Sequence, residues 1–309
     1  MIFKEFKALG TDITIMADLA AGQENVLTAA WQEVLNFEKR FSRFIIDSEL
    51  SRLNNSQDTE QKVSAVMSEL LTSAKYYYYK TKGVYDPTIL GSLEAVGYNQ
   101  SFDKIVASPN EINLKELSEK FAARIKMDEL EIVGGRIIAP LGFKIDLGGI
   151  GKGFIVDLLG EKFFSDVSNY WISAGGDILS AGDHKIDVQN PIKPEENIFY
   201  INTQGRKLGI ATSGIIKRNG ISGNFKWHHL IDPITGLPVM SGILSVTVIS
   251  PTATKADILA KTVLIMGETA GLNFIEQEDD SACIIFFKDK EPIFSKRAKN
   301  FVKKYEDEK

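Results

Sequence analysis

Hydrophobic and polar residues alternate along the first part of the chain, and this pattern predicts a pair of strands. Apolar side chains occupy roughly every second position of residues 2–17, a period typical of a strand with one buried face. Gly10 interrupts the run and predicts a turn there. From about residue 22 to residue 40 the apolar positions recur at helical spacing instead, which predicts an amphipathic helix.

The rest of the first half contains two clear helix signals. In "DSELSRLNN", Asp47 or Ser48 is expected to cap a short helix. The run "QKVSAVMSELLTSAKYYYYKTKG" predicts a long helix that Gly83 ends, and the segment that follows to about residue 127 has no clear pattern. The elements expected next are strands near 130–139 and 143–147 and a helix at about 151–165.

The second half is rich in predicted strands, which form groups instead of alternating with helices. This grouping favours an α+β fold over a doubly wound parallel sheet. We expect mixed and antiparallel sheets with packed helices, arranged as two intimately associated lobes with a ligand in the cleft between them. The expected strands are 169–173, 185–190, 197–203, 207–212, 227–231, 242–250 and 281–287, with helices at about 255–266 and from Gly267 to about 277.

Composition and charge exclude several classes of protein. The chain has 309 residues, a net charge of −5 and a sequence pI near 5.5, so no basic face is available for nucleic acid. No stretch approaches the ~20 apolar residues that span a bilayer. The N-terminal residues lack the apolar core of a signal peptide, which indicates a cytoplasmic protein, or an exported one whose leader precedes this numbering.

The residue types available limit which metal the protein can bind. Three histidines and one cysteine nearly rule out a structural zinc site, so a bound metal is expected to be a hard, oxygen-ligated ion such as magnesium. The single cysteine, Cys283, lies in an apolar run and is expected in the core, with no internal disulfide.

Glycines surround a lysine in "KIDLGGIGKGFIVD", residues 144–157. The spacing fits neither a dinucleotide fingerprint nor a P-loop. A tight strand-to-helix turn is one interpretation. The other is an anionic ligand that approaches bare main chain and Lys152. Asp146 before the glycines and Asp157 after them favour a polar ligand.

Five further motifs have structural interpretations, and most also allow a functional one. Asp177 of "ISAGGDI" is expected to cap a turn, and the Thr212–Gly214 segment is either a turn or a phosphate-binding nest. At least one histidine of "WHHLIDPITGLPV" is expected to be satisfied by backbone. Asp257 either caps a helix or ligates a cation, with Lys261 one turn further along the same face. "YDPTILGSLEAVGYN" is either loop packing or a nucleobase contact.

Taken in order, these motifs resemble the ApbE family, the FAD:protein FMN transferases. The resemblance covers about residues 8–267, and its carriers are "ALGTDITI", "FSRFIIDSELSRLNN", "YDPTILGSLEAVGY", "IDLGGIGKGFIVD", "ISAGGDI", "ATSG", "HLIDPITGLPV" and "SVTVISPTATKADILAKTVLIMG". It implies a single domain over residues 1–309 and a magnesium-dependent transfer of FMN from FAD to a threonine or serine hydroxyl of a target flavoprotein, with release of AMP. Magnesium and positioning are the usual means of such transfers.

The resemblance also implies roles for individual residues. His229 corresponds to a candidate general base, and Asp257 to a catalytic metal-binding aspartate. The main-chain carbonyl of Gly149 corresponds to a second metal ligand. The implied FAD contacts are Val84, Tyr85 and Asp86 near the adenine, together with Asp146, Lys152 and Ile231.

Three residues depart from the family pattern. Leu9 stands where methionine is frequent and Phe44 where tyrosine is usual. Both keep apolar or stacking surface, but Phe44 lacks the tyrosine hydroxyl. Lys261 stands where the family has a threonine metal ligand, and a protonated amine cannot ligate magnesium. Lys261 could neutralise the pyrophosphate directly. The alternatives are therefore an FAD-binding protein with weak or no transferase activity, an FAD pyrophosphatase, or a nucleotide-binding scaffold of another kind.

Overall fold

The structure, a computed structural model, describes residues 1–101, 104–105 and 112–305, and it confirms the α+β class. The chain divides into two compact units, each assembled from separate stretches of sequence. The first unit comprises Met1–Asn36, Lys152–Ile216 and Ser241–Lys309, and the second comprises Phe37–Gly151 and Lys217–Met240. The single domain over 1–309 and the ligand cleft between lobes stay predictions.

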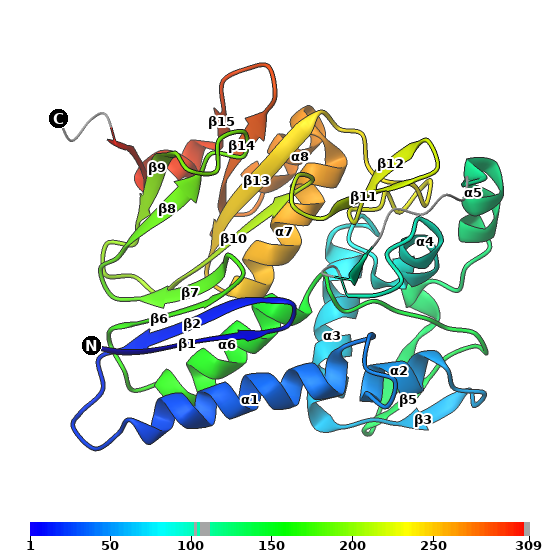
Figure 1. Cartoon of the computed structure of the whole chain (residues 1–309), viewed down its shortest axis with the longest axis horizontal. Coiled ribbons are helices and arrows are strands. Elements are labelled where there is room, and N and C mark those ends of the chain that lie inside the picture. The colour runs from blue at the N-terminus through cyan, green and yellow to red at the C-terminus, as the bar shows by residue number, and fades with distance from the viewer. Residues whose placement is uncertain (102–103, 106–111, 306–309) are drawn as a thin grey trace. The chain divides into compact units, whose positions relative to one another are not determined.

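The first unit is built on an eight-stranded antiparallel sheet (Figure 1). The N-terminal hairpin predicted with a turn at Gly10 forms one edge of it. The strand order is β1-β2-β6-β7-β10-β13-β14-β15. Their bounds are β1 Ile2–Ala8, β2 Thr11–Ala17, β6 Tyr170–Ala174, β7 Asp177–Ala181, β10 Leu208–Gly214, β13 Ile243–Ser250, β14 Ala282–Phe287 and β15 Ile293–Phe294.

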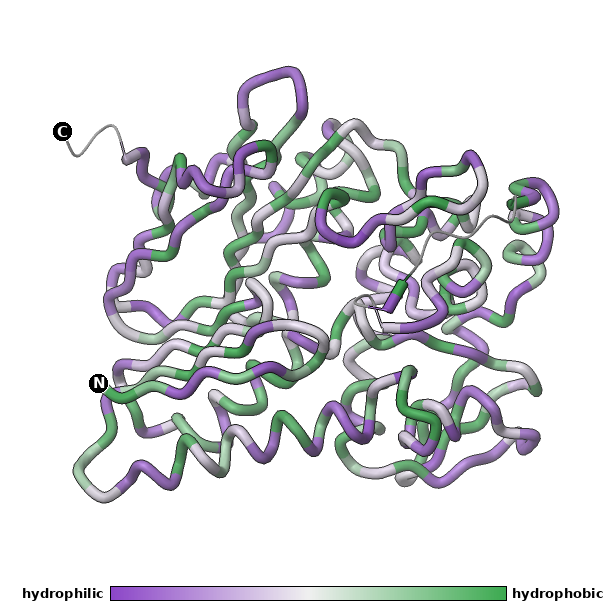
Figure 2. Tube along the Cα trace, viewed as in Figure 1, coloured by the Kyte–Doolittle hydropathy of each residue, from purple (hydrophilic) through white to green (hydrophobic). Residues whose placement is uncertain are grey.

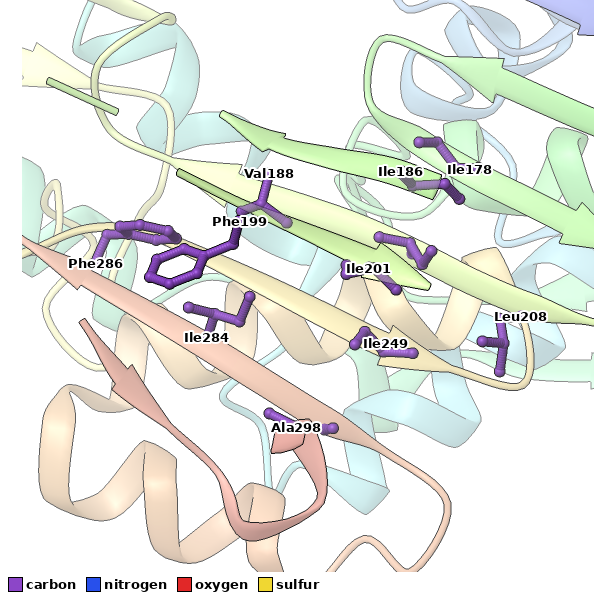
Figure 3. Close-up of a cluster of buried hydrophobic side chains, with 12 residues drawn as sticks. Ile178, Ile186, Val188, Phe199, Ile201, Leu208, Ile249, Ile284, Phe286 and Ala298 are labelled. Atoms are coloured by element: carbon purple, nitrogen blue, oxygen red, sulfur yellow. The ribbon is translucent and has the colours of Figure 1, made fainter. Parts of the chain in front are cut away.

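A second, three-stranded sheet shares a buried apolar cluster with the large sheet (Figure 3). It contains β8 Lys185–Gln189, β9 Asn197–Asn202 and β16 Val302–Lys304, beside the short helix η4 Lys296–Asn300. Phe199 of β9 packs against Phe286 and Phe294. Cys283 is buried and free, as expected, and burial raises the pKa of its thiol to about 12.

Helices complete the first unit. α7 (Ala253–Met266) packs on β10 and β13, and α8 (Glu268–Glu276) packs on α7. α6 (Gly151–Phe164) lies close to β6 and β7, since Gly160 faces Tyr170 and Leu179. α1 (Asn25–Phe41) alternates between hydrophilic and hydrophobic positions along its length (Figure 2). None of the helices in the described ranges has the length and apolar character needed to cross a membrane.

The second unit consists of short helices and two small sheets. The helices and strands of this unit are α2 Glu49–Asn54, β3 Glu60–Lys62, α3 Ala65–Lys80, η1 Pro87–Ile89, α4 Leu90–Ala95, α5 Leu114–Ala122, η3 Met127–Glu129, β4 Glu131–Val133, β5 Arg136–Ile138, β11 Asn219–Ser222 and β12 Phe225–His228. Ser48 caps α2 and Ser64 caps α3. After α3 the chain reverses at Gly83, whose φ is +80°, so this predicted stop signal is confirmed.

One predicted strand is wrong, and the structure shows why. Residues 143–147 belong to no strand. Asn54 Nδ2 donates to the carbonyl oxygen of Ile145, and Asn54 Oδ1 accepts from the backbone amide of Ile145, both at 2.9 Å. A neighbouring strand would otherwise supply these hydrogen bonds.

Other elements differ in extent from their predictions. Residues 130–139 form the hairpin of β4 and β5, which turns at Gly134 and Gly135. Strand β10 continues to Gly214, and Thr212 Oγ1 lies 2.8 Å from Thr247 Oγ1 of β13. The segment proposed as a turn or a nest is therefore a paired strand. The sequence patterns did not predict the strands β3, β7, β11, β15 and β16 or the helices α4 and α5.

Gly153 generates the first testable prediction, because α6 approaches the start of α7 there. A Cβ at this position would lie 2.7 Å from Thr254 Cα and 2.8 Å from the carbonyl oxygen of Ala253. We expect Gly153→Ala to lower the free energy of unfolding by about 2 kcal/mol, although alanine is the better helix former by about 1 kcal/mol. Urea denaturation measures the change.

Gly151→Ala is the matched control. It lies at the start of the same helix, and its Cβ would meet nothing closer than Phe37 Cε1 at 3.6 Å, an ordinary contact. Equal stabilities of the two variants would contradict the close approach of the helices.

Candidate functional site

Two buried ion pairs form the polar centre of the first unit. Lys152, the second residue of α6, donates from its ammonium group to Asp177 Oδ2 at the start of β7. The Asp177 side chain is 1% exposed and the Lys152 side chain is 16% exposed. The sequence predicted Lys152 as a ligand contact but assigned Asp177 to a turn. The structure makes Asp177 the partner of that lysine.

The second pair lies within α7. Lys261 donates to Asp257 Oδ1 across one helical turn, and Asp257 is 1% exposed. Within the part of the chain that the structure describes, Asp257 Oδ2 is buried and has no hydrogen-bond partner. A buried carboxylate oxygen without a partner is costly, so this atom is the clearest candidate to receive a cation or a donor from a ligand.

The two pairs influence each other through their charges. Burial raises the pKa of the Asp177 carboxyl, and the negative charge of Asp257 raises it further. The ammonium groups of Lys152 and Lys261 act in the opposite direction. Two acids and two ammonium groups therefore form one electrostatic cluster in the first unit.

Asp157 has a structural task in place of the ligand contact that its position suggested. Its carboxylate accepts hydrogen bonds from the amides of Ala253 and Thr254, both at 2.8 Å, and from Thr254 Oγ1. These bonds satisfy the first amides of α7 and place negative charge at the helix N-terminus. Asp157 thus fixes the helix that carries Asp257.

In the second unit, Asp146 anchors the glycine-rich segment. Its Oδ1 pairs with Arg43 Nε at 2.8 Å, and its Oδ2 accepts from the amide of Gly148 at 3.0 Å. Its own amide donates to the carbonyl oxygen of Pro87 at 2.8 Å. The carboxylate orders the main chain just before Gly149, which is half-buried.

Arg43 also lies against two aromatic rings. Its guanidinium carbon lies 4.2 Å from the ring centre of Phe44 and 4.7 Å from that of Tyr98, and its Nη2 donates to the carbonyl oxygen of Tyr98 at 2.7 Å. Phe44 is 38% exposed. It therefore retains an apolar face for a planar ligand.

The turn at residues 84–88 is held from inside the protein. Tyr85 and Asp86 are buried, and Val84 is half-buried. Asp86 Oδ1 accepts from the amide of Thr88 at 2.9 Å and from its hydroxyl at 2.6 Å, while Oδ2 pairs with Arg124 at 2.6 Å. These bonds place the Asp86 carboxylate inside the turn.

The two adjacent histidines have different environments. His228 Nε2 lies 2.8 Å from the carbonyl oxygen of Val239, and its Nδ1 accepts from the amide of Leu230 at 3.3 Å, so backbone satisfies this histidine as expected. His229 Nδ1 lies 3.3 Å from the carbonyl oxygen of Arg218. A carbonyl only accepts, so this contact favours the neutral tautomer with the proton on Nδ1.

The following turn contains Ile231, which is 2% exposed and bridges to Pro238. The amide of Gly236 donates to the carbonyl oxygen of Asp232 at 2.8 Å. Gly236 has φ +72°, and a Cβ there would lie 2.4 Å from the Phe121 ring. This stiff turn therefore depends on glycine.

Leu9 lies at the tip of the β1–β2 hairpin with a φ of +56°, next to Gly10 at +65°. Two successive positive φ values suit a two-residue hairpin turn, but a leucine there is strained. The backbone therefore holds an apolar side chain at a position where glycine or asparagine is usual.

The structure thus brings the predicted residues together in two groups. One group, in the first unit, joins Lys152 to the Asp257 and Lys261 pair. The other, in the second unit, links the Phe44, 84–86 and Asp146–Gly149 segments, and it reaches the turn after Ile231 through Arg124. Sequence patterns did not predict the roles of Asp177, Arg43 and Arg124, because each role depends on contacts with residues distant in sequence.

Among the described residues, no three histidine, cysteine, aspartate or glutamate side chains gather closely enough to hold a metal ion. The candidate that fits is Asp257 Oδ2, a buried carboxylate oxygen without a partner in the described chain, because magnesium frequently binds one or two carboxylates together with substrate phosphates. Lys261 is no ligand.

A sequence model described as the ApbE family matches residues 9–285. The FAD:protein FMN transferase of Vibrio cholerae strain O395 is 28% identical over 249 residues, which cover 77% of this chain and 72% of that protein. The FAD:protein FMN transferase of Escherichia coli K12 is 25% identical over 283 residues, which cover 87% of this chain and 77% of that protein.

Solved structures share the fold. The crystal structure of the ApbE protein of Thermotoga maritima has a TM-score of 0.86 and 24% identity, and the match covers 97% of this chain and 98% of that chain. The flavin transferase ApbE of Vibrio cholerae has a TM-score of 0.79 and 23% identity, with the same coverage.

His228 generates a prediction about pH. Burial lowers the pKa of its imidazole, and the hydrogen bond to the Val239 carbonyl opposes this effect. The unfolded state therefore binds more protons below the ordinary pKa of about 6.5, so His228 makes the folded protein lose stability as pH falls below that value. The His228→Gln variant keeps a side-chain amide that can donate to the carbonyl but does not titrate. We expect its free energy of unfolding to fall less than that of the wild type when the pH is lowered.

Urea unfolding of both proteins at pH 7.5 and pH 5.5 measures this difference. The quantity that decides is the change in the free energy of unfolding between the two pH values, not the stability of either protein alone. Parallel losses in the two proteins would show that His228 titrates alike in the folded and unfolded states.

Proposed function

The chain belongs to the ApbE family, and we propose that it is an FAD:protein FMN transferase. In this reaction the hydroxyl oxygen of a threonine or serine in a target flavoprotein attacks the phosphorus on the FMN side of FAD. The P–O bond to the AMP part breaks, AMP leaves, and the hydroxyl gives up its proton. Two relatives of this chain bear the name of this activity.

The charge cluster of the first unit is the observation that carries the proposal. A diphosphate needs its negative charge neutralised while the attacking and leaving oxygens are held in line. Lys152 and Lys261 supply two ammonium groups beside buried acids, and their side chains are 16% and 13% exposed. Neither lysine side chain is fully buried, and binding of a diphosphate there would use charges that the fold has already partly desolvated.

Asp257 is the residue that would hold magnesium, through its buried Oδ2. The carbonyl oxygen of Gly149 is the second ligand that the family resemblance proposes. When bound, the ion would neutralise charge on the diphosphate and polarise its oxygens. Asp157 contributes indirectly, because its hydrogen bonds to Ala253 and Thr254 hold the helix that bears Asp257.

His229 is the proposed general base. With its Nδ1 proton directed to the Arg218 carbonyl, Nε2 is the atom that would take the hydroxyl proton. The proposed flavin and adenine contacts divide by exposure. Leu9 and Phe44 offer side-chain surface, whereas Tyr85, Asp86 and Ile231 are buried and would act mainly through the main chain that they fix.

A second candidate function rests on one observation, the ion pair of Lys261 with Asp257 Oδ1. A protein ammonium group there takes one of the two oxygens that a metal ion would use. The chain would then bind FAD with weak or no transfer of FMN to protein, or would pass FMN to water as an FAD pyrophosphatase.

The transferase is tested by incubating the protein with FAD, magnesium and a target flavoprotein domain. We expect a fluorescent covalent flavin band on the target and one AMP for each FMN transferred. His229→Asn should reduce the rate by about 10²–10⁴-fold while FAD binding stays unchanged. No band across several target domains would contradict the transferase, and free FMN with AMP in the absence of any target would favour the pyrophosphatase.

Lys261→Thr separates the two candidate functions. Removing the ammonium group frees both oxygens of Asp257, so we expect magnesium to bind about tenfold more tightly in the presence of FAD. Isothermal titration of magnesium into the FAD-loaded protein measures this. If the second candidate is correct, transfer also rises.

Lys255→Thr is the matched control. Lys255 lies on the same helix, and its ion pairs are with Glu278 and Asp280. This variant should leave magnesium binding unchanged. If Lys261→Thr gains neither magnesium affinity nor activity, Lys261 does not limit the site.

A further inference from the structure

We infer that Arg124 is a positioning residue for dinucleotide binding. It joins the turn at residues 84–88 to the turn at residues 232–236. The inference rests on the proposed function, because the ligand is taken to be FAD. Arg124 lies just after α5, in the segment where the sequence shows no clear pattern, and no motif pointed to it.

Three acceptors on two separate turns bind the same guanidinium group. Arg124 Nη2 donates to Asp86 Oδ2 at 2.6 Å and to the carbonyl oxygen of Pro233 at 3.2 Å. Its Nε donates to Thr88 Oγ1 at 3.2 Å. The bond to Pro233 spans 109 residues of sequence. Together the three bonds connect side chains of the 84–88 turn with the main chain of the 232–236 turn.

Partners inside the protein occupy the Asp86 carboxylate. Its side chain is 2% exposed, and both of its oxygens already accept hydrogen bonds, Oδ1 from Thr88 and Oδ2 from Arg124. A buried carboxylate is tolerated only when it is paired and hydrogen-bonded. Asp86 and Arg124 therefore depend on each other, and the ligand would meet the turn that they shape.

The last turn of α5 in turn holds Arg124 in place. Arg124 Nη1 donates to the Phe121 carbonyl oxygen at 3.2 Å, and the Arg124 guanidinium carbon lies 3.7 Å from the centre of the Phe121 ring. The same ring packs against Gly236, where a Cβ would lie 2.4 Å from it. Phe121 and Arg124 thus contact the 232–236 turn together.

The chemistry of arginine suits this task. Its planar fork carries five donors in fixed directions, so one side chain serves an acid, a hydroxyl and a carbonyl at once. Lysine is a point charge on a flexible stem. At this position it would keep the ion pair with Asp86 but lose the hydrogen bonds to Thr88 and Pro233. The connection extends to the glycine-rich segment, because the Pro87 carbonyl accepts from the amide of Asp146.

The test compares Arg124→Gln and Arg124→Lys with Arg40→Gln in the full chain. Arg40 is the matched control because it also pairs with an acid of the second unit, Glu49, at 3.0 Å. Its other partners, Ser64 and Phe41, lie outside both turns. FAD affinity is measured by fluorescence titration well below the melting temperature. Hydrogen exchange of residues 84–88 and 232–236 is measured on the ligand-free proteins.

We expect Arg124→Gln to weaken FAD binding about tenfold, the lower end of the loss caused by removing an orienting partner, and to speed exchange in both turns. Arg124→Lys should recover part of the affinity. Arg40→Gln should lower the melting temperature without changing FAD affinity or exchange in the two turns.

Different outcomes overturn the two proposals. If the wild type takes up no FAD, the proposed function is wrong, and exchange alone then decides whether Arg124 holds the turns. If the wild type binds FAD and Arg124→Gln binds it as tightly as Arg40→Gln does, Arg124 has no positioning role. Exchange that stays at the wild-type rate in either turn overturns the inference as well.

Discussion

The structure depends on one constraint, which is that a carboxylate taken out of water needs a cation or hydrogen-bond donors beside it. Four aspartates of the two candidate groups have a cationic partner within the protein. In the second unit the partners are arginines, and in the first unit they are lysines. The pairs are Asp86 with Arg124, Asp146 with Arg43, Asp177 with Lys152 and Asp257 with Lys261.

This division between arginine and lysine has a physical consequence. Arg43 and Arg124 each bind several acceptors in fixed directions, so their aspartates act on the shape of turns. Lys152 and Lys261 are point charges on flexible stems, and each holds its aspartate with a single ammonium group. A diphosphate that approached them would compete for the same ammonium protons. The second unit is therefore suited to shaping a binding surface, and the first to exchanging an internal partner for a ligand.

Local signals in the sequence predicted the parts of the fold that depend on local chemistry. Gly83 ends its helix and Gly10 turns its hairpin because each effect involves only adjacent residues. The 143–147 strand was predicted wrongly because Asn54, about ninety residues away, supplies the hydrogen bonds. Arg124 could not be found for the same reason, since its role lies in acceptors on two distant turns. The candidate site was predicted through its motifs, and the partners that hold those motifs in place required the structure.

The Asp257 and Lys261 pair is exceptional because both members lie on one helix, four residues apart. Helical geometry alone brings them together, so the pair forms whenever α7 forms and needs no other part of the molecule. Under the proposed function, a magnesium ion would therefore compete with an ammonium group held at a high effective concentration. The ion could still bind Asp257 through Oδ2, which is buried and has no hydrogen-bond partner in the described chain. Under the proposed function, the residue at position 261 would thus set which cation the site prefers.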